Sequence, residues 1–345
     1  RQEQITLNVY NWGMNMADGT DGTMDLIAEF EKRYPHIKVN MSEYESNEVL
    51  YTKLSSGGIT VDVIIPSDYM IDRMIAEDML ETLDYSNIPN FSLIDDRFKN
   101  LPYDPTNKYT VPYAWGTVGI IYDAAVVEEP VTSWDVMFSD EYAGNVLMFR
   151  NSRDALATAL FYLGYDVNTS DEAQLREAQQ LLADAKGRGV YQAFVMDEIY
   201  GKMEGGNAAI GAYYAGDYLS MVDNQAEGVD LQFAVPEEGS NWFVDAMCIL
   251  KDAPHKEEAE AWINFIASTE ANLANMDYIW YASPNKEALE QYPAYYEELY
   301  EEELDPEVYE IMAASRETLN RCQMYVALPK ETRALYNKLW TELGI

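Results

Sequence analysis

The stretch Ile5-Thr6-Leu7-Asn8-Val9-Tyr10 alternates apolar and polar residues, and it begins the pattern that decides the fold class. Alternation of this kind predicts a strand. Further elements are predicted in order: a helix over Met24–Tyr34, a strand over Ile37–Glu43, a helix over Glu48–Ser56 and a strand over Val61–Ile65. This β-loop-α-β-α-β order indicates an α/β fold, an open sheet with helices on both faces.

The loops that follow these strands carry the first candidate site residues. In open α/β sheets, ligands meet the loops at the carboxyl ends of strands. Trp12 follows the first predicted strand, and Pro66-Ser67-Asp68-Tyr69 follows the third. Each has a structural alternative, since Trp12 could pack inside its loop and Ser67 could cap the helix from Tyr69. Because both loops reach one edge of the sheet, we interpret them together as a candidate ligand site.

The stretch Asn241–Leu250 contains a carboxylate in an apolar setting. Residues 244–250 read as a buried strand, interrupted by Asp245 and preceded by Trp242 and Phe243. A lone carboxylate there is costly unless a cation or hydrogen-bond donors meet it. A carboxylate beside aromatic faces suits an organic cation. The structural alternative is an aspartate that caps a loop at the strand end.

A second α/β set follows the first. Strands are predicted over Tyr109–Tyr113 and Val118–Tyr122, and the Ala114-Trp115-Gly116-Thr117 link between them suggests a passage between domains. The carboxyl ends of the second set carry four candidate contacts: Asn151, Asp154, Tyr214 and Asp217. Both acids also lie at predicted helix starts, where the helix dipole favours a carboxylate without any ligand.

Composition limits the function classes. A chain of 345 residues is long enough for two domains, and its net charge of −37 argues against nucleic acid and anionic membranes as partners. We interpret Cys248 and Cys322 as buried free thiols, with a disulfide as the alternative. The only histidines are His36 and His255, so we expect no zinc site, no cofactor and no histidine-based catalysis.

A set of short motifs along the chain resembles the spermidine/putrescine-binding proteins of bacterial polyamine ABC importers, which are two-lobed periplasmic solute-binding proteins. The motifs are Tyr10-Asn11-Trp12, Tyr44-Glu45-Ser46-Asn47-Glu48, Pro66-Ser67-Asp68-Tyr69, Pro112-Tyr113-Ala114-Trp115-Gly116, Thr132-Ser133-Trp134, Leu163-Gly164-Tyr165, Asp245, Tyr281, Ser283-Pro284-Asn285 and Gln323. The resemblance covers nearly the whole chain, and it implies two α/β lobes, each an open mixed sheet flanked by helices.

The resemblance also implies a ligand site in the cleft between the lobes. It assigns Trp12, Ser67 and Tyr69 to the first lobe, Asn151, Asp154, Tyr214 and Gln323 to the second, and Phe243, Asp245 and Tyr281 to the rest of the box. Tyr214-Ala215-Gly216-Asp217 resembles a motif of the putrescine-specific branch, which adds Asp217. The chain departs from the family at Gly13-Met14-Asn15 and at Asn151, where acids are often found, and it has Tyr214 and Phe243 where tryptophan is common.

We therefore expect a non-enzymatic polyamine receptor that delivers its ligand to a membrane permease. Lobe 1 is predicted to comprise residues 1–116 and 245–285, and lobe 2 residues 117–244 and 286–345. We expect a monomer, periplasmic or extracellular or held to the membrane by a lipid, whose polar start Arg1-Gln2-Glu3-Gln4 follows a removed signal peptide. The alternatives are a carbohydrate receptor and a glycoside hydrolase that uses Asp154 and Asp245.

Overall fold

The computed structural model describes residues 3–345, and these divide into two compact units. Unit 1 is the chain up to Trp115 together with Phe243–Pro306, and unit 2 is Gly116–Trp242 together with Glu307–Ile345. The chain therefore passes between the units three times, at 115/116, 242/243 and 306/307. The expectation about the first two residues lies outside the described part of the chain.

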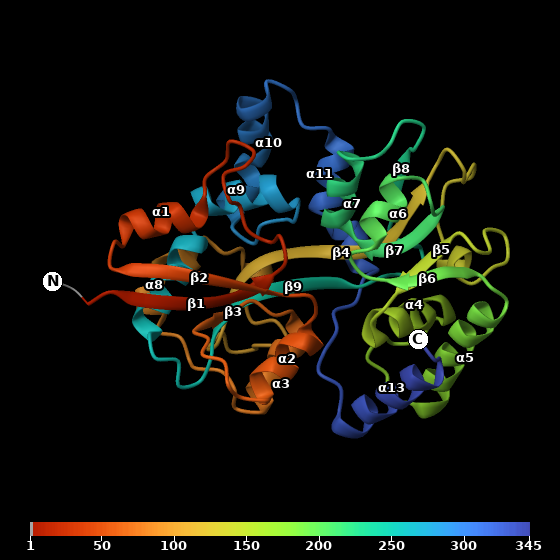
Figure 1. Cartoon of the computed structure of the whole chain (residues 1–345), viewed down its shortest axis with the longest axis horizontal. Coiled ribbons are helices and arrows are strands. Elements are labelled where there is room, and N and C mark those ends of the chain that lie inside the picture. The colour runs from red at the N-terminus through yellow and green to blue at the C-terminus, as the bar shows by residue number, and fades with distance from the viewer. Residues whose placement is uncertain (1–2) are drawn as a thin grey trace. The chain divides into compact units, whose positions relative to one another are not determined.

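Unit 1 contains the first α/β set and the segment that returns to it (Figure 1). Its elements are β1 (Ile5–Trp12), α1 (Leu26–Arg33), β2 (Ile37–Tyr44), α2 (Asn47–Ser55), β3 (Val63–Ile64), α3 (Asp68–Ala76), three short 3-10 helices (Tyr85–Asn87, Pro89–Leu93 and Asp96–Phe98), the start of β4 (Val111–Asp123), β9 (Trp242–Ile249), α8 (Lys256–Ile266), α9 (Thr269–Ile279) and α10 (Lys286–Tyr300).

The strands of unit 1 form a mixed sheet in the order β2-β1-β3-β9. β1 runs parallel to β2 and β3, and β9 runs antiparallel to β3. Figure 1 shows α1 on one side of β1 and β2 and helices α2 and α3 on the other. Asp25 and Ser46 cap α1 and α2 through side-chain hydrogen bonds, so both helices begin close to where the sequence predicts them.

The segment after residue 285 differs from the expectation. Residues 286–306 belong to unit 1, whereas the sequence assigns them to the second lobe. The reason lies in α9, because Tyr300 of α10 donates a hydrogen bond to Asp277 of α9 (2.7 Å) and Trp280 packs edge-on against Tyr292. The aromatic face of α10 is therefore anchored to unit 1, and the third passage of the chain falls at 306/307.

Unit 2 contains the second α/β set. Its elements are the remainder of β4, a 3-10 helix (Trp134–Met137), β5 (Val146–Phe149), α4 (Ser152–Leu163), α5 (Glu172–Gly187), β6 (Tyr191–Val195), α6 (Ile199–Glu204), β7 (Ile210–Tyr214), α7 (Ala215–Val222), β8 (Leu231–Ala234), α11 (Pro306–Met312), α12 (Arg316–Asn320) and α13 (Lys330–Glu342).

The strands of unit 2 form a second mixed sheet, in the order β4-β7-β5-β6, with β8 also paired to β4. β5 runs parallel to β6 and β7, whereas β4 runs antiparallel to β7 and β8. Gly119 of β4 permits β8 to approach closely, because a Cβ there would lie 2.5 Å from the carbonyl oxygen of Ala234. Both units thus confirm the predicted class of mixed sheets flanked by helices.

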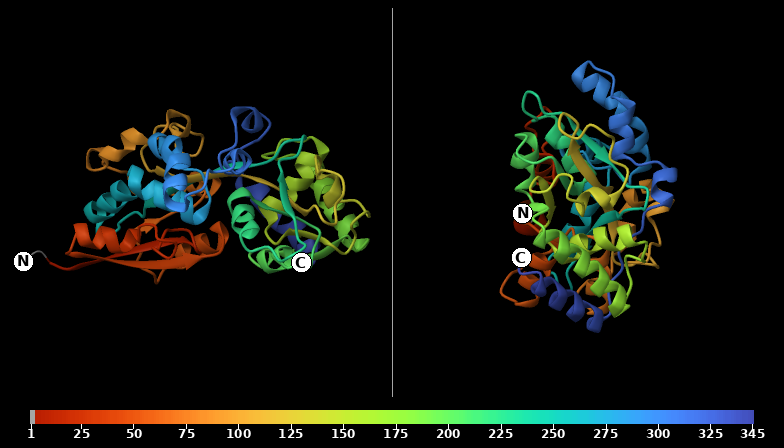
Figure 2. Two further views of the ribbon diagram at one scale, coloured as in Figure 1. Left: turned by 90° about the horizontal axis from the view of Figure 1, so that it is seen from above. Right: turned by 90° about the vertical axis from the view of Figure 1, so that its right-hand side faces the viewer.

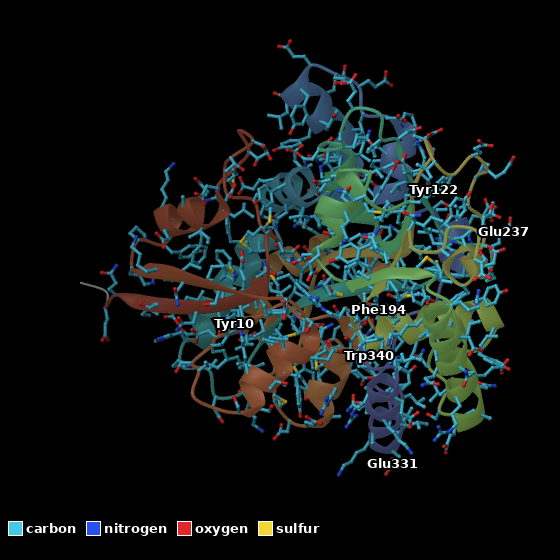
Figure 3. All side chains as sticks on the ribbon, turned by 45° about the vertical axis from the view of Figure 1, so that its right-hand side comes forward. Tyr10, Tyr122, Phe194, Glu237, Glu331 and Trp340 are labelled. Carbon is cyan, nitrogen blue, oxygen red and sulfur yellow. The ribbon has the colours of Figure 1, made fainter. Side chains whose placement is uncertain are left out.

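Two strands differ from the sequence prediction. The two strands expected around Ala114–Thr117 are one continuous, buried strand, β4, and Gly116 does not interrupt it. β6 is not predicted at all, because Tyr191–Val195 shows no clean alternation. Its half-buried side chains include Phe194, which packs edge-on against Trp340 of α13 (Figure 3).

The C-terminal helix α13 completes unit 2. Figures 1 and 2 agree in placing it beside α4 and α5. Lys186 of α5 donates a hydrogen bond to the carbonyl oxygen of Leu343, just beyond α13 (2.7 Å). Among the described residues, no helix is long and apolar enough to cross a membrane. Cys248 and Cys322 are both free thiols, the first buried and the second partly exposed.

Candidate functional site

Asp245 lies in the middle of β9 and not at a strand end, so it does not cap a loop. The antiparallel register of β3 and β9 continues past β3 and places Ser67 opposite Asp245. The hydroxyl of Ser67 donates a hydrogen bond to Asp245 Oδ1 (2.7 Å), and both residues are buried. Ser67 occupies the N-cap position of α3, but its side chain makes no capping bond. The alternative interpretation of Ser67 as a simple cap is therefore wrong.

Asp68, which the sequence analysis does not single out, fixes this arrangement. It is fully buried in the first turn of α3. Its Oδ2 accepts a hydrogen bond from the backbone N–H of Val244 (3.0 Å), and its Oδ1 accepts one from the N–H of Tyr69 (2.7 Å). One carboxylate thus joins the start of α3 to the β9 residue that precedes Asp245.

Trp12, the last residue of β1, is held in one orientation. Its indole Nε1 donates to the carbonyl oxygen of Ile65 (2.8 Å), and the hydroxyl of Tyr44 donates to the same oxygen (2.6 Å). The Trp12 and Tyr44 rings lie 4.9 Å apart between centroids. Asn11 Oδ1 accepts from the Trp12 backbone N–H (2.8 Å). Trp12 is half-buried, so its indole is fixed at one edge while part of its surface stays accessible.

Three further aromatic residues predicted as contacts lie in unit 1. Phe243 and Tyr281 pack with ring centroids 5.9 Å apart and planes inclined by 59°. The hydroxyl of Tyr69 donates to Glu48 Oε1 (2.7 Å) and accepts from Asn47 Nδ2 (3.1 Å). The bonds of Tyr69 join the starts of α2 and α3.

Two buried tyrosines respond to the charge of Asp245. Burial, and then the nearby Asp245 carboxylate, raise the pKa of Tyr44 well above its ordinary value. Burial also raises the pKa of Tyr113, and the Asp245 charge adds to that shift. Both hydroxyls therefore stay protonated and neutral.

In unit 2, Asp154 lies at the centre of a second cluster. Asn151, the N-cap of α4, accepts from the Asp154 N–H (2.8 Å), and its Nδ2 donates to Asp154 Oδ2 (3.0 Å). The hydroxyls of Tyr214 and Tyr325 donate to Asp154 Oδ2 (2.6 Å) and Oδ1 (2.8 Å). Parallel pairing of β5 with β7 brings the loop after β5 beside the end of β7, which explains why Asp154 and Tyr214 meet.

Asp154 lies in the first turn of α4, as predicted, and it accepts two tyrosine hydroxyls. It is 8% exposed. Tyr325 is a residue that sequence reasoning missed; its only signal was its position two residues after Gln323. The guanidinium of Arg153 lies over the Tyr325 ring, 4.7 Å from the ring centroid.

Asp217 has a different partner from Asp154. It is the third residue of α7 and accepts a hydrogen bond from the hydroxyl of Tyr200. Burial, followed by the charge of Asp217, raises the pKa of Tyr200, so this hydroxyl remains a donor. The neighbouring Tyr213 donates in the same way to Asp197 (2.9 Å).

Gln323 is engaged with the backbone of unit 2. Its Oε1 accepts from the Val167 N–H (3.1 Å), and its carbonyl oxygen accepts from the Trp242 N–H (3.2 Å) and from Asn241 Nδ2 (3.0 Å). These bonds hold the segment that leads to Tyr325 against the loop before β9. The Gln323 side chain is thus used to position this segment.

The predicted site residues form clusters within each unit. Unit 1 brings together Ser67 and Asp245, fixes Trp12 beside the same loop, and pairs Phe243 with Tyr281. Unit 2 brings together Asn151, Asp154 and Tyr214, with Asp217 held separately by Tyr200. In the described part of the chain, no group of His, Cys, Asp or Glu side chains has the arrangement of a metal site.

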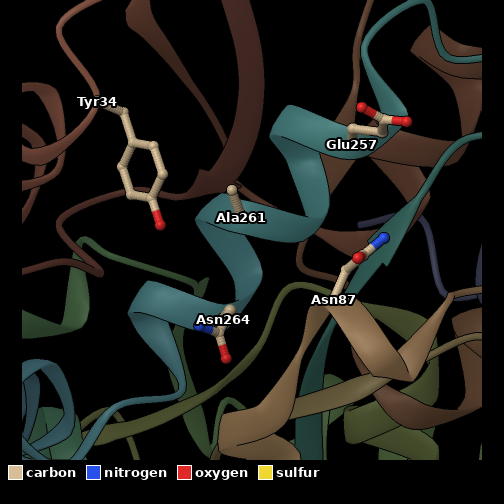
Figure 4. Close-up of a pocket in the computed structure, with 5 residues that line it drawn as sticks. All are labelled: Tyr34, Asn87, Glu257, Ala261 and Asn264. Carbon is tan, nitrogen blue, oxygen red and sulfur yellow. The ribbon is translucent and has the colours of Figure 1, made fainter.

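One polar depression of unit 1 lies apart from these clusters. It has a volume of about 310 Å³ and is lined by Tyr34, Asn87, Glu257, Ala261 and Asn264 (Figure 4). The last three of these residues lie on helix α8. The depression contains none of the predicted ligand contacts, so we do not assign the ligand to it.

Comparison with known proteins identifies the family of this chain. The family of bacterial extracellular solute-binding proteins matches residues 25–299. The spermidine/putrescine-binding periplasmic protein of Escherichia coli K12 is 33% identical over 286 residues, which cover 81% of this chain and 78% of that protein. The putrescine-binding periplasmic protein SpuD of Pseudomonas aeruginosa is 30% identical over 353 residues, with 98% and 91% covered.

Two solved structures of similar proteins share the fold of this chain. The spermidine/putrescine ABC transporter substrate-binding protein PotD from Streptococcus pneumoniae superposes with a TM-score of 0.81 at 33% identity, covering 99% of both chains. The TpPotD lipoprotein of Treponema pallidum superposes with a TM-score of 0.83 at 26% identity, covering 98% of this chain and 99% of that one. With its two α/β units and a family match over most of its length, the chain belongs to the bacterial extracellular solute-binding proteins.

Proposed function

We propose that this protein is a polyamine receptor that binds spermidine or putrescine outside the cytoplasm and delivers it to the permease of an ABC importer. The family is one of solute receptors, and relatives at 30% to 33% identity are named for spermidine and putrescine. The alternatives of a carbohydrate receptor or a glycoside hydrolase have no comparable support among these relatives.

The observation that carries the proposal is the environment of Asp245. This carboxylate is 8% exposed, accepts the hydroxyl of Ser67, and follows Phe243 on the same strand. An alkylammonium group needs a carboxylate for its charge and aromatic faces for its polarised methylene groups. Asp245, with Trp12, Phe243 and Tyr281 in the same unit, provides both.

The second cluster is proposed to complete ligand recognition. We assign further contacts to Asn151, Asp154, Tyr214, Asp217 and Gln323 of unit 2, and to Ser67 and Tyr69 of unit 1. Asp154 and Asp217 already accept tyrosine hydroxyls, which keeps each carboxylate in one orientation. A carboxylate has about four lone-pair sites, so such a hydrogen-bonded acid can still accept from an ammonium group.

The proposal also covers the location, the oligomeric state and the partner of the protein. We propose a periplasmic or extracellular location, with a lipid anchor as one form of attachment, because one similar structure is described as a lipoprotein. We propose that the receptor acts as a monomer and that its partner is a membrane permease. Cell fractionation and light scattering of the purified protein test the location and the monomeric state.

Calorimetric titration with putrescine, spermidine and a panel of sugars tests the central proposal. We expect saturable binding of at least one polyamine and none of the sugars. Binding of a sugar, with no heat from either polyamine, would favour the carbohydrate alternative. Release of free sugar from an oligosaccharide would favour the hydrolase.

A further inference from the structure

Glu43 brings a carboxylate to the loop that follows Trp12. The parallel register of β1 and β2 sets Asn11 opposite Glu43 and Trp12 opposite Tyr44, so both strands end at the same edge of the sheet. Glu43 Oε1 accepts a hydrogen bond from the backbone N–H of Met14 (3.3 Å). A Cβ on Gly13 would lie 3.6 Å from Glu43 Oε2. Both carboxylate oxygens therefore lie close to the Gly13–Met14 backbone.

The loop presents this carboxylate together with apolar surface. Met14 is 79% exposed and has a φ of 52°, a left-handed conformation that is unusual outside glycine. Its thioether therefore lies in solvent, on the same residue whose backbone contacts the Glu43 carboxylate. An ammonium group attached to a methylene chain needs this combination of a charge partner and adaptable apolar contact.

Trp12 connects this loop to Asp245 within unit 1. Its indole is bonded to the carbonyl of Ile65, two residues before Ser67, and Ser67 is bonded to Asp245. The strand order β2-β1-β3-β9 puts Glu43 on β2, Trp12 on the neighbouring β1 and Asp245 on β9. Trp12 therefore lies between the strands that carry the two carboxylates.

We propose that Glu43 is a specificity-determining residue that binds an ammonium group of a long polyamine at the end away from Asp245. The inference rests on the proposed polyamine function and adds to it a residue that favours triamines over diamines. A diamine with one ammonium group at Asp245 has only one other charge, which binds the acids of unit 2. A triamine has two other charges, and the second of them can bind Glu43.

The variant Glu43→Gln tests this proposal, because it removes the charge and keeps an acceptor for the Met14 N–H. Glu45→Gln is the matched control, since Glu45 is an exposed acid two residues away. We expect Glu43→Gln to weaken spermidine binding by about threefold to fivefold, the upper part of the range for exposed ion pairs. We expect less than about a twofold change for putrescine, and the same small change for both ligands in Glu45→Gln.

Glu43→Asp retains the charge and should restore most of the spermidine affinity. The proposal is overturned if Glu43→Gln leaves spermidine binding unchanged, weakens both polyamines equally, or matches Glu45→Gln. Near-ultraviolet circular dichroism checks that each variant keeps its tertiary structure. Titration of the unmodified protein separates the two proposals, because a wild-type chain that binds no polyamine refutes the function itself, and the role of Glu43 with it.

Discussion

At the scale of single residues, Asp245 should carry most of the binding free energy. Asp245→Asn keeps the size of the side chain but leaves a desolvated ammonium group without its charge partner. We expect a loss of about 2–5 kcal/mol of binding free energy, as for other buried charge pairs. Calorimetry measures this loss, with Asp252→Asn, an exposed aspartate just after β9, as the control. A loss below about tenfold, with the fold intact, would place the main charge contact elsewhere.

The aromatic residues should contribute less to the binding free energy than Asp245, and the loss of any one ring should weaken binding. Trp12→Ala, Tyr214→Ala and Phe243→Ala each remove a ring that can contact the cation and its methylene groups. We expect each to weaken polyamine binding by roughly 0.5–2 kcal/mol. Titrations of the three variants measure this, with Tyr162→Ala, an aromatic residue that is 39% exposed on unit 2, as the control. Affinities unchanged in all three would show that the rings serve packing alone.

At the scale of elements, the cap of α4 links stability to the site. Asn151 satisfies the backbone N–H of Asp154 and donates to its carboxylate. Asn151→Ala should lower the free energy of unfolding of unit 2 by about 1 kcal/mol, the usual cost of a lost N-cap. Urea denaturation measures this. Asn151→Ser keeps a capping acceptor without placing a second carboxylate beside Asp154, so it should recover most of this loss. An equal loss in both variants would mean that the capping bond contributes little.

The elements also show how far the sequence predicts the site. Alternation and capping residues indicate β1, α1, β2 and α2 closely, because those signals are local. The neighbouring sequence also identifies Asp245 as an unusual residue in a strand. The hydrogen bond from Ser67 to Asp245 cannot be predicted in this way, because it depends on the register of β3 with β9 and joins residues 178 positions apart.

The site residues that were not predicted also act through hydrogen bonds to distant parts of the chain. Asp68 accepts from the Val244 N–H, Tyr44 donates to the Ile65 carbonyl oxygen, and Tyr325 donates to Asp154. Each partner lies outside the element that carries the residue. Nothing in the neighbouring sequence of a tyrosine shows which carbonyl or carboxylate its hydroxyl will meet. The aromatic and acidic residue types could therefore be predicted, but their hydrogen-bond partners required the sheet topology.

At the scale of the whole molecule, charge favours a cationic solute. The chain has 60 acidic and 23 basic residues, and the resulting field attracts cations over a distance set by the ionic strength. This field acts on every polyamine, and more strongly on one with three charges than on one with two. It does not by itself fix the ligand, because a solvated acidic surface also serves solubility. Ligand choice therefore depends on the carboxylates placed at the clusters.

Those carboxylates lead to a prediction about ligand length. Asp154, Asp217 and Asp245 can balance the three charges of spermidine, with Glu43 able to take the place of one acid of unit 2, whereas the two charges of putrescine leave at least one acid unpaired. Against this, Asn151 is uncharged, and both oxygens of Asp154 already accept hydrogen bonds, which weakens the hold on a third charge. We expect spermidine to bind at least as tightly as putrescine, by no more than ~1–2 kcal/mol, the scale of one charge-assisted hydrogen bond.

Competitive titration of both ligands on one preparation measures this margin. A preference for putrescine of about tenfold, or 1.4 kcal/mol, would contradict the prediction. It would mean that Tyr214 and Asp217 set the ligand length while Asp154 serves the structure of α4 alone. In that case Asp154→Asn should leave the affinity for putrescine unchanged, because the acid that a diamine leaves unpaired would be the one that already accepts two tyrosine hydroxyls.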